Sequence, residues 1–132
     1  KGSKNDIKLG MVVLDETYLV GKIVEVNYMT SRVLLLSDLN SKIPVIIEPG
    51  GIQSILSGTG KNHGVIQYLK ENYPIENNSI VYTSGSGGLF KPGIPIGVLK
   101  LLEIEDKNII NFFSDYSQLE FVEIKSFNKK EY

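Results

Sequence analysis

Short runs of β-branched, leucine and aromatic residues recur along this chain, and turns rich in glycine, proline, asparagine and serine separate them. Residues 19–26 and 32–37 flank the turn sequence 27–31, which predicts a β-hairpin. The segment 119–124 alternates apolar residues with acids, as a strand with one buried face does. Further strands are predicted over 11–14, 43–48, 52–57, 65–69, 79–83, 94–104 and 109–113. Strands that recur about every ten residues predict an all-β antiparallel barrel or sandwich.

Three single residues refine this pattern. Gly21 interrupts a predicted strand, which favours a bulge or bend at that position. Pro44 has no N–H to donate, so it is expected near the start of its strand or on a sheet edge. Ser114 stands where the N-cap of a short helix or turn over 114–120 would lie, and both readings remain open there.

An internal similarity suggests how the strands divide into lobes. Val20-Gly21-Lys22-Ile23 is similar to Ile96-Gly97-Val98-Leu99, and both stretches continue into apolar runs that end in acids. If the similarity is not chance, both strands belong to one lobe and the chain between them forms another. We therefore predict a first lobe from 10–39 plus 93–125, an inserted second lobe from 40–92, and flexible ends at 1–9 and 126–132.

The composition limits the chemistry. A chain of 132 residues, 42% hydrophobic and 22% charged, is long enough to bury a core without staples. The absence of cysteine excludes disulfides, thiol catalysis and zinc-thiolate sites. A net charge of −1 provides no basic face for nucleic acid. The start has neither an initiator methionine nor an apolar leader, and no apolar run approaches the roughly 20 residues of a membrane span, so we expect a fragment of a longer protein.

No catalytic or cofactor motif is complete. A serine protease needs a serine, a histidine and an orienting aspartate, yet no aspartate lies between His63, the single histidine, and Ser86. The sequence Gly58-Thr59-Gly60-Lys61 lacks the upstream glycine and the following Ser/Thr of a phosphate-binding loop. One histidine, no cysteine and scattered acids give no ligand spacing. We predict no catalytic residues, no metal and no cofactor.

Two groups of residues are the candidates for structure and for binding. We expect structural turns at Gly58, Gly60, Gly85, Gly87, Gly88, Pro92 and Gly93, with a positive φ at one or more glycines of each cluster. Pro44 blunts one sheet edge but leaves Val45, Ile46 and Ile47 free to pair with a partner. Leu89-Phe90 lies in a glycine-rich loop, either as a plug beneath a barrel or as an exposed partner contact.

Three blocks, in order and at this spacing, resemble the extracytoplasmic domain of the MreC family of rod shape-determining proteins. The blocks lie at 19–26 with 30–38 and 41–45, then at Gly51 with 56–60, then at 83–97. The resemblance implies an all-β domain of two small antiparallel barrel-like lobes, similar in outline to chymotrypsin-like double barrels. It also implies an inner-membrane protein whose membrane helix and coiled coil precede a domain on the periplasmic, or outer, side of the cytoplasmic membrane.

The expected function is therefore a non-catalytic scaffold of the cell-wall elongation complex that controls cell shape. The resemblance implies as partners MreD, the elongation-specific penicillin-binding transpeptidase and a second copy of the chain, in a homodimer or a filament. We expect weak self-association without the coiled coil, and transpeptidase binding through the second lobe. A secreted chymotrypsin-like serine hydrolase and an OB-like single-strand nucleic-acid binder are the alternatives.

Overall fold

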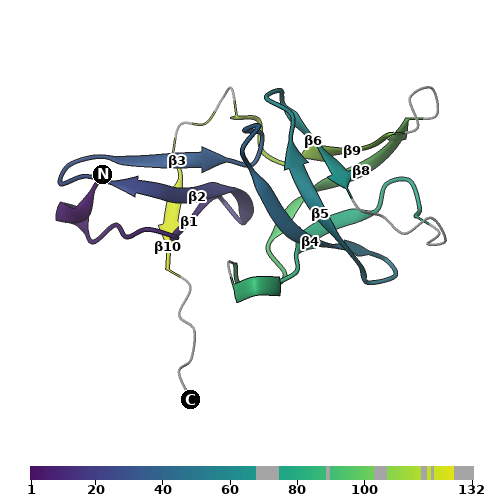
Figure 1. The fold of residues 1–132 in the computed structure, drawn as a ribbon, viewed down its shortest axis with the longest axis horizontal. Coiled ribbons are helices and arrows are strands. Elements are labelled where there is room, and N and C mark those ends of the chain that lie inside the picture. Colours follow the sequence, from purple (N-terminus) through teal and green to yellow (C-terminus); the bar gives the residue numbers. More distant parts are fainter. Residues whose placement is uncertain (68–74, 89, 103–106, 117–118, 120, 127–132) are drawn as a thin grey trace, which may run out of the picture.

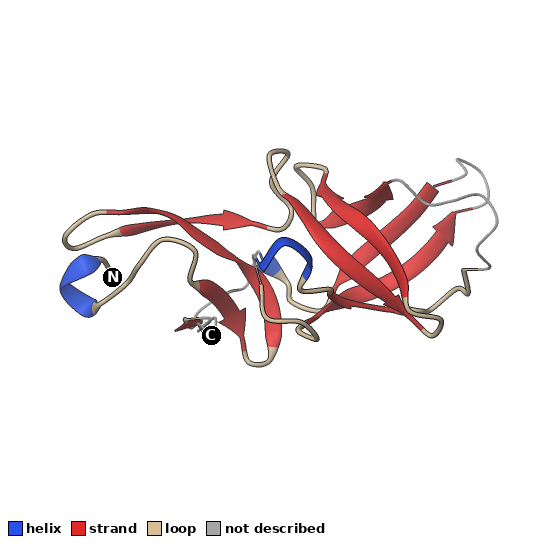
Figure 2. Cartoon of the chain, turned by 60° about the horizontal axis from the view of Figure 1, so that its bottom comes forward, coloured by secondary structure: helices blue, strands red, loops and turns tan. Residues whose placement is uncertain are grey.

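The computed structural model describes residues 1–67, 75–88, 90–102, 107–116, 119 and 121–126. It is built from antiparallel strands, with two short 3₁₀ turns, η1 (Ser3–Asn5) and η2 (Ser86–Gly88) (Figures 1 and 2). The strands are β1 (Val12–Asp15), β2 (Tyr18–Val26), β3 (Ser31–Leu35), β4 (Lys42–Glu48), β5 (Ile52–Gly58), β6 (His63–Gln67), β7 (Ile80–Thr83), β8 (Pro95–Leu102), β9 (Lys107–Phe112) and β10 (Glu123–Lys125). The predicted all-β class with two antiparallel units is confirmed.

The smaller unit is an open four-stranded sheet in the order β10-β1-β2-β3. The predicted hairpin of β2 and β3 is present, with Val26 paired to Ser31 across the turn. The register between β1 and β2 shifts where Val13 pairs with Gly21 and Leu14 with Leu19, which leaves Val20 as the extra residue of a bulge. The irregularity predicted at Gly21 is therefore found beside it.

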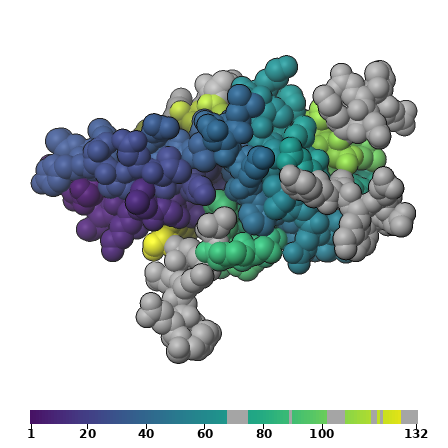
Figure 3. Space-filling model, viewed as in Figure 1, coloured from purple at the N-terminus to yellow at the C-terminus, as the bar shows by residue number. Residues whose placement is uncertain are grey.

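The larger unit is a closed barrel in the order β4-β5-β6-β9-β8-β7. It forms the right-hand part of Figure 1, and the space-filling view shows it packed directly against the sheet (Figure 3). Pro44 pairs with Ile55 of β5, while the pairing of β4 with β7 begins only at Val45. The missing N–H of Pro44 thus lies at the end of that ladder, near the strand start as predicted.

The prediction that strands 19–26 and 94–104 share one lobe is wrong. The described part of the second strand, β8, pairs with β7 and β9 in the barrel, so of the segment 93–125 only β10 joins the sheet. The similarity has a local cause: a Cβ on Gly21 would lie 2.3 Å from the Leu34 carbonyl oxygen, and one on Gly97 would lie 2.3 Å from that of Asn111. Both strands need glycine because a neighbouring backbone crosses closely, and this need does not place them in one sheet.

The first nine residues are attached to the sheet, contrary to the flexible end predicted for 1–9. The amides of Ser3 and Lys4 each donate to the turn between β2 and β3, to the carbonyls of Asn27 and Tyr28 at 2.8 Å. Ile7 is buried against the face of the sheet that points away from the barrel. Of the other predicted flexible end, 126–132, residues 127–132 lie outside the described residues.

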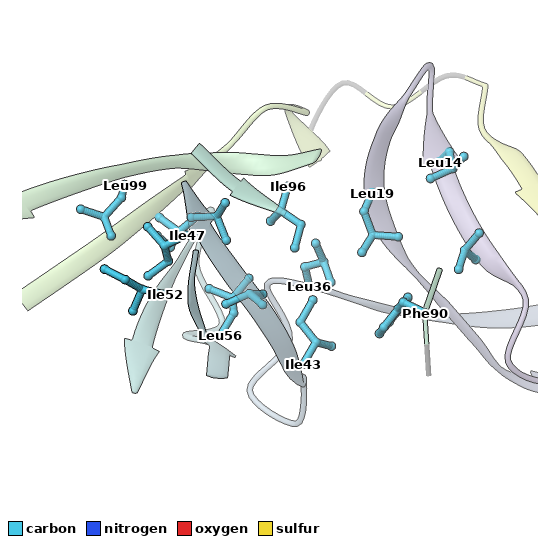
Figure 4. Close-up of a cluster of buried hydrophobic side chains, with 14 residues drawn as sticks. Leu14, Leu19, Leu36, Ile43, Ile47, Ile52, Leu56, Phe90, Ile96 and Leu99 are labelled. Carbon is cyan, nitrogen blue, oxygen red and sulfur yellow. The ribbon is translucent and has the colours of Figure 1, made fainter. Parts of the chain in front are cut away.

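One hydrophobic core runs through both units. Its members come from the sheet and from the barrel. In Figure 4, Leu36 lies between Leu19 of the sheet and the barrel residues Ile43 and Ile96. A second, smaller cluster on the opposite face of the sheet contains Ile7, Val13, Val20 and Ile23. Because Val12 and Leu14 belong to the first cluster and Val13 to the second, β1 is buried on both faces.

We predict that Gly58→Ala destabilises the domain far more than Gly87→Ala. A Cβ on Gly58 would lie 1.9 Å from the Asp38 carbonyl oxygen, so two backbone segments would have to separate. We expect a loss of at least about 3 kcal/mol in the free energy of unfolding. At Gly87 the positive φ costs about 1 kcal/mol, but no atom lies within 4 Å of the added methyl group. Urea titration of both variants measures the difference, and equal losses would contradict the prediction.

Candidate partner-binding surfaces

The loop between β7 and β8 is held in one conformation by Thr83. Its hydroxyl donates to the Lys91 carbonyl at 2.7 Å and accepts from the Ile94 amide at 2.9 Å, and its carbonyl accepts from the Gly93 amide at 2.9 Å. Positive φ angles occur at Gly60 and at Gly85, Gly87, Gly88 and Gly93, so the prediction for the two glycine clusters is confirmed. Gly58 itself is the last residue of β5 and does not form the turn assigned to it.

Phe90 is a core residue, and its assignment as an exposed partner contact is wrong. Its side chain is 2% exposed and belongs to the core that joins the two units. Figure 4 shows it near Leu19 of the sheet, and Leu14 belongs to the same core, although the loop of Phe90 connects two barrel strands. The glycine-rich loop bends far enough to insert this ring between the units, which is the plug alternative. The other half of the predicted contact, Leu89, lies outside the described residues.

Val45, Ile46 and Ile47 do not form a free edge. β4 pairs with β5 on one side and with β7 on the other, and Val45 and Ile47 are completely buried. The prediction failed because the closure of the barrel depends on β7, which the sequence places more than 30 residues later. A closed barrel has no edge strand to offer to a partner.

The residues considered for catalysis have other partners. The Ser86 hydroxyl donates to Oε1 of Gln53 on β5 at 3.4 Å. His63 begins β6 opposite Asn111, and its carbonyl accepts the Thr59 hydroxyl at 2.8 Å. The same hydroxyl accepts the Lys61 amide at 3.2 Å, which makes Gly58-Thr59-Gly60-Lys61 part of the β5–β6 connection. Within the described ranges, no group of three or more metal-ligating side chains is present.

Aromatic rings cover the junction between sheet and barrel. Tyr18 of β2 contacts Phe113, which follows β9, with ring centroids 4.8 Å apart. Tyr116 stacks on Phe112 at 5.1 Å and touches both hydrophobic clusters. Burial raises the pKa of Tyr116 well above its ordinary value, because the phenolate would lose its hydration. Ser114, the proposed N-cap, is buried and its hydroxyl has no hydrogen-bond partner among the described residues.

The available edges lie in the sheet and not on β4, which is paired on both sides. β3 and β10 are its outer strands, and in the part of the chain that is described neither has a partner on its outer side. Large exposed apolar side chains lie near both: Tyr28 and Met29 at the turn before β3, Leu39 after it, and Phe121 and Val122 just before β10. Exposed strand edges flanked by apolar side chains are typical of binding surfaces.

A cleft of about 350 Å³ opens between the sheet and the β7–β8 loop. Its floor contains Val12 and Leu14 of β1, and its walls come from the loop and from β10. We call it the interlobe cleft, and it is lined by Val12, Leu14, Glu16, Thr17, Lys91, Pro92, Gly93, Ile94, Pro95, Lys125 and Ser126.

A closed six-stranded antiparallel barrel packed against an open four-stranded antiparallel sheet places the chain in the class of two-unit all-β domains. Residues 1–126 match the family described as "Rod shape-determining protein MreC, barrel core", and the chain belongs to this family. The cell shape-determining protein MreC of Caulobacter vibrioides is 36% identical over 126 residues, covering 96% of this chain and 36% of the relative. That of Escherichia coli is 32% identical, covering 80% and 29%. The chain thus spans about a third of the length of these relatives.

Solved structures share the fold. The crystal structure of MreC from Pseudomonas aeruginosa is 27% identical and superimposes with a TM-score of 0.81 over 96% of this chain and 85% of that one. A structure described as the major periplasmic domain of the cell shape-determining filament MreC superimposes with a TM-score of 0.79 at 21% identity, covering 96% and 84%. A complex between Penicillin-Binding Protein (PBP2) and MreC from Helicobacter pylori has a TM-score of 0.68 at 18% identity, covering 86% and 74%.

The described residues contain no helix with the length and apolar character needed to cross a membrane. The solved relatives named above include a domain described as periplasmic.

We predict that Phe90→Ala lowers the free energy of unfolding by about 3–5 kcal/mol, because it leaves a cavity at the junction of the two units. Phe121→Ala is the matched control: its ring is 86% exposed, so its removal should change stability by no more than about 0.5 kcal/mol. Thermal and urea unfolding of both variants measure this. A Phe90 variant as stable as the control would show that the ring does not hold the units together.

Proposed function

We propose that this domain is a non-catalytic scaffold of the cell-wall elongation complex and controls cell shape by binding wall-synthesis proteins. The observation that carries the proposal is that residues 1–126 belong to the MreC family. A structure with a similar fold, MreC from Helicobacter pylori, has been solved in complex with PBP2, which supports the same proposal. In the same proposal the domain lies on the outer side of the cytoplasmic membrane, held there by a membrane helix outside this chain, with MreD, the elongation-specific transpeptidase and a second copy as partners.

The arrangement of the described residues supports binding rather than catalysis. The residues considered for a hydrolase have other positions: the Ser86 hydroxyl donates to Gln53, and His63 is a residue of β6, paired with Asn111 of β9. The units share one hydrophobic core, so the surfaces that they present are fixed relative to each other. A scaffold requires such fixed surfaces.

The direct test uses this domain and the extracellular region of the elongation transpeptidase from the same organism. We expect saturable binding in the micromolar range, typical of interactions that are strengthened in the cell by linkage to a membrane and a coiled coil. A fluorophosphonate probe should leave Ser86 unlabelled, and single-stranded DNA should not bind at physiological salt. Labelling of Ser86, or failure to bind the transpeptidase, would contradict the scaffold proposal.

The open edge of β3 is our proposed surface for self-association. The backbone groups of β3 that point away from β2 have no strand partner among the described residues, and two copies can continue the sheet by pairing these edges. Val33 and Leu35 pack into the smaller cluster, whereas Leu34 is half-buried and belongs to neither cluster. A charge at position 34 should therefore affect a partner strand more than the fold.

We predict that Leu34→Glu weakens self-association at least about fivefold, because a charge on an edge strand opposes strand addition. The pairing partner of Leu34 within the sheet is Lys22, so the new carboxylate meets an opposite charge inside its own molecule. Leu101→Glu, on the paired barrel strand β8 and 39% exposed in the native domain, is the control. Sedimentation equilibrium compares the two. Equal dissociation constants would assign self-association to another surface.

A further inference from the structure

The interlobe cleft combines an apolar floor with charged walls. In the register of β1 and β10, Val12 faces Lys125 and Leu14 faces Glu123, so these four side chains lie on one face of the sheet. The intervening pair, Val13 and Ile124, belongs to the opposite face and packs into the smaller cluster. The face toward the β7–β8 loop therefore offers two aliphatic side chains at the bottom and a lysine above them.

The two lysines of the cleft come from different units. Lys125 is contributed by β10, and Lys91 by the loop that Thr83 fixes. Glu16, at the β1–β2 turn, is the one acidic residue among the lining residues. Lys125 also lies 3.5 Å from Glu123, but both side chains are more than half exposed, and such pairs exchange readily for a better partner. The lining thus carries a net positive charge and favours a ligand with a carboxylate.

The size of the cleft restricts the ligand further. A volume of about 350 Å³ is too small for a helix, whose diameter with side chains is about 10 Å. It suits one apolar side chain and its neighbours in an extended segment. Val12 and Leu14 are less than 10% exposed, so they only close the bottom of the cleft, and the core beneath them fixes this floor before binding. The larger apolar surface comes from the exposed Pro92 and the half-buried Ile94 and Pro95.

We propose that the interlobe cleft binds an extended segment of the transpeptidase, with an apolar side chain on Ile94 and Pro95 over the buried floor and a neighbouring carboxylate between Lys91 and Lys125. The inference rests on the scaffold function proposed above and adds to it the surface and the chemistry of recognition. It also requires both units at once, since neither the sheet nor the loop alone forms the cleft.

The test compares two double charge reversals for binding to the extracellular region of the transpeptidase. Lys91→Glu with Lys125→Glu should weaken binding about tenfold or more, because the partner carboxylate then meets two like charges. Lys42→Glu with Lys61→Glu makes the same change in net charge at exposed barrel positions outside the cleft and should leave binding unchanged. Glu16→Lys should tighten binding about threefold. All four lysines are exposed, so circular dichroism should show unaltered folding.

Hydrogen exchange on the unaltered complex gives a second readout. We expect the amides of residues 91–95 and 123–126 to exchange more slowly when the transpeptidase is bound. Binding by the cleft variant equal to that of the unaltered domain, or protection confined to β3, would overturn the cleft assignment and leave the scaffold function in place. Equal weakening in both double variants would also overturn it, since net charge alone would then explain the effect. No binding by the unaltered domain would overturn the scaffold function and the cleft together.

Discussion

The hydrophobic core shared by the sheet and the barrel is the interaction on which the other features depend. A four-stranded open sheet buries little apolar surface by itself and gains stability by packing against another element. Here the barrel supplies that surface, and Phe90 crosses from the β7–β8 loop into the sheet. Since the ring is almost completely buried, the relative position of the two units is set by side-chain packing rather than by a single connecting strand. The interlobe cleft exists only because this position is fixed.

The barrel is closed and the sheet is open, so the two units offer different kinds of surface to a partner. All barrel strands are paired on both sides, so the barrel can contribute only its loops and its outward-facing side chains. Among the described residues the sheet keeps two unpaired edges, and the β3 edge carries Arg32 as its second residue, exposed and with its guanidinium 3.7 Å from the Glu25 carboxylate. A charged side chain on an edge limits indiscriminate pairing without abolishing it. Within the described residues, unpaired strand edges are therefore confined to the smaller unit.

Most strand positions were predictable from the sequence because they depend on local alternation and turn chemistry, but the alternating segment 119–124 was placed too early, since the strand there is Glu123–Lys125. The segments 19–26, 43–48 and 52–57 lie within a residue or two of β2, β4 and β5. Strand partners were not predictable, because pairing depends on contacts between distant segments. The motif around Gly97 illustrates the difference. Its glycine indicates that another backbone segment approaches closely, but the sequence does not identify that segment.

The candidate binding residues failed for the same reason. An apolar pair in a glycine-rich loop and an aliphatic strand after a proline both resemble exposed contacts as long as their neighbours are unknown. Phe90 packs in one core with residues of β1 and β2, which lie far from it in the chain. Val45 lies between β5, which follows after a turn, and β7, which comes much later. The cleft was not apparent either, because Lys91 and Lys125 are brought together only by the three-dimensional fold.

The position of the barrel within the chain also determines how the molecule assembles during synthesis. The barrel strands β4 to β9 follow one another without interruption, whereas the sheet is split, with residues 36–122 between β3 and its outer strand β10. Strands β1 to β3 are synthesised before the barrel strands, with their barrel-facing side still uncovered. Four of the six barrel pairings join strands that are neighbours in the sequence, whereas β4 with β7 and β6 with β9 join distant ones. Local pairings form faster than distant ones. We expect β10 to join last, so that one wall of the interlobe cleft is completed only when the whole domain has folded.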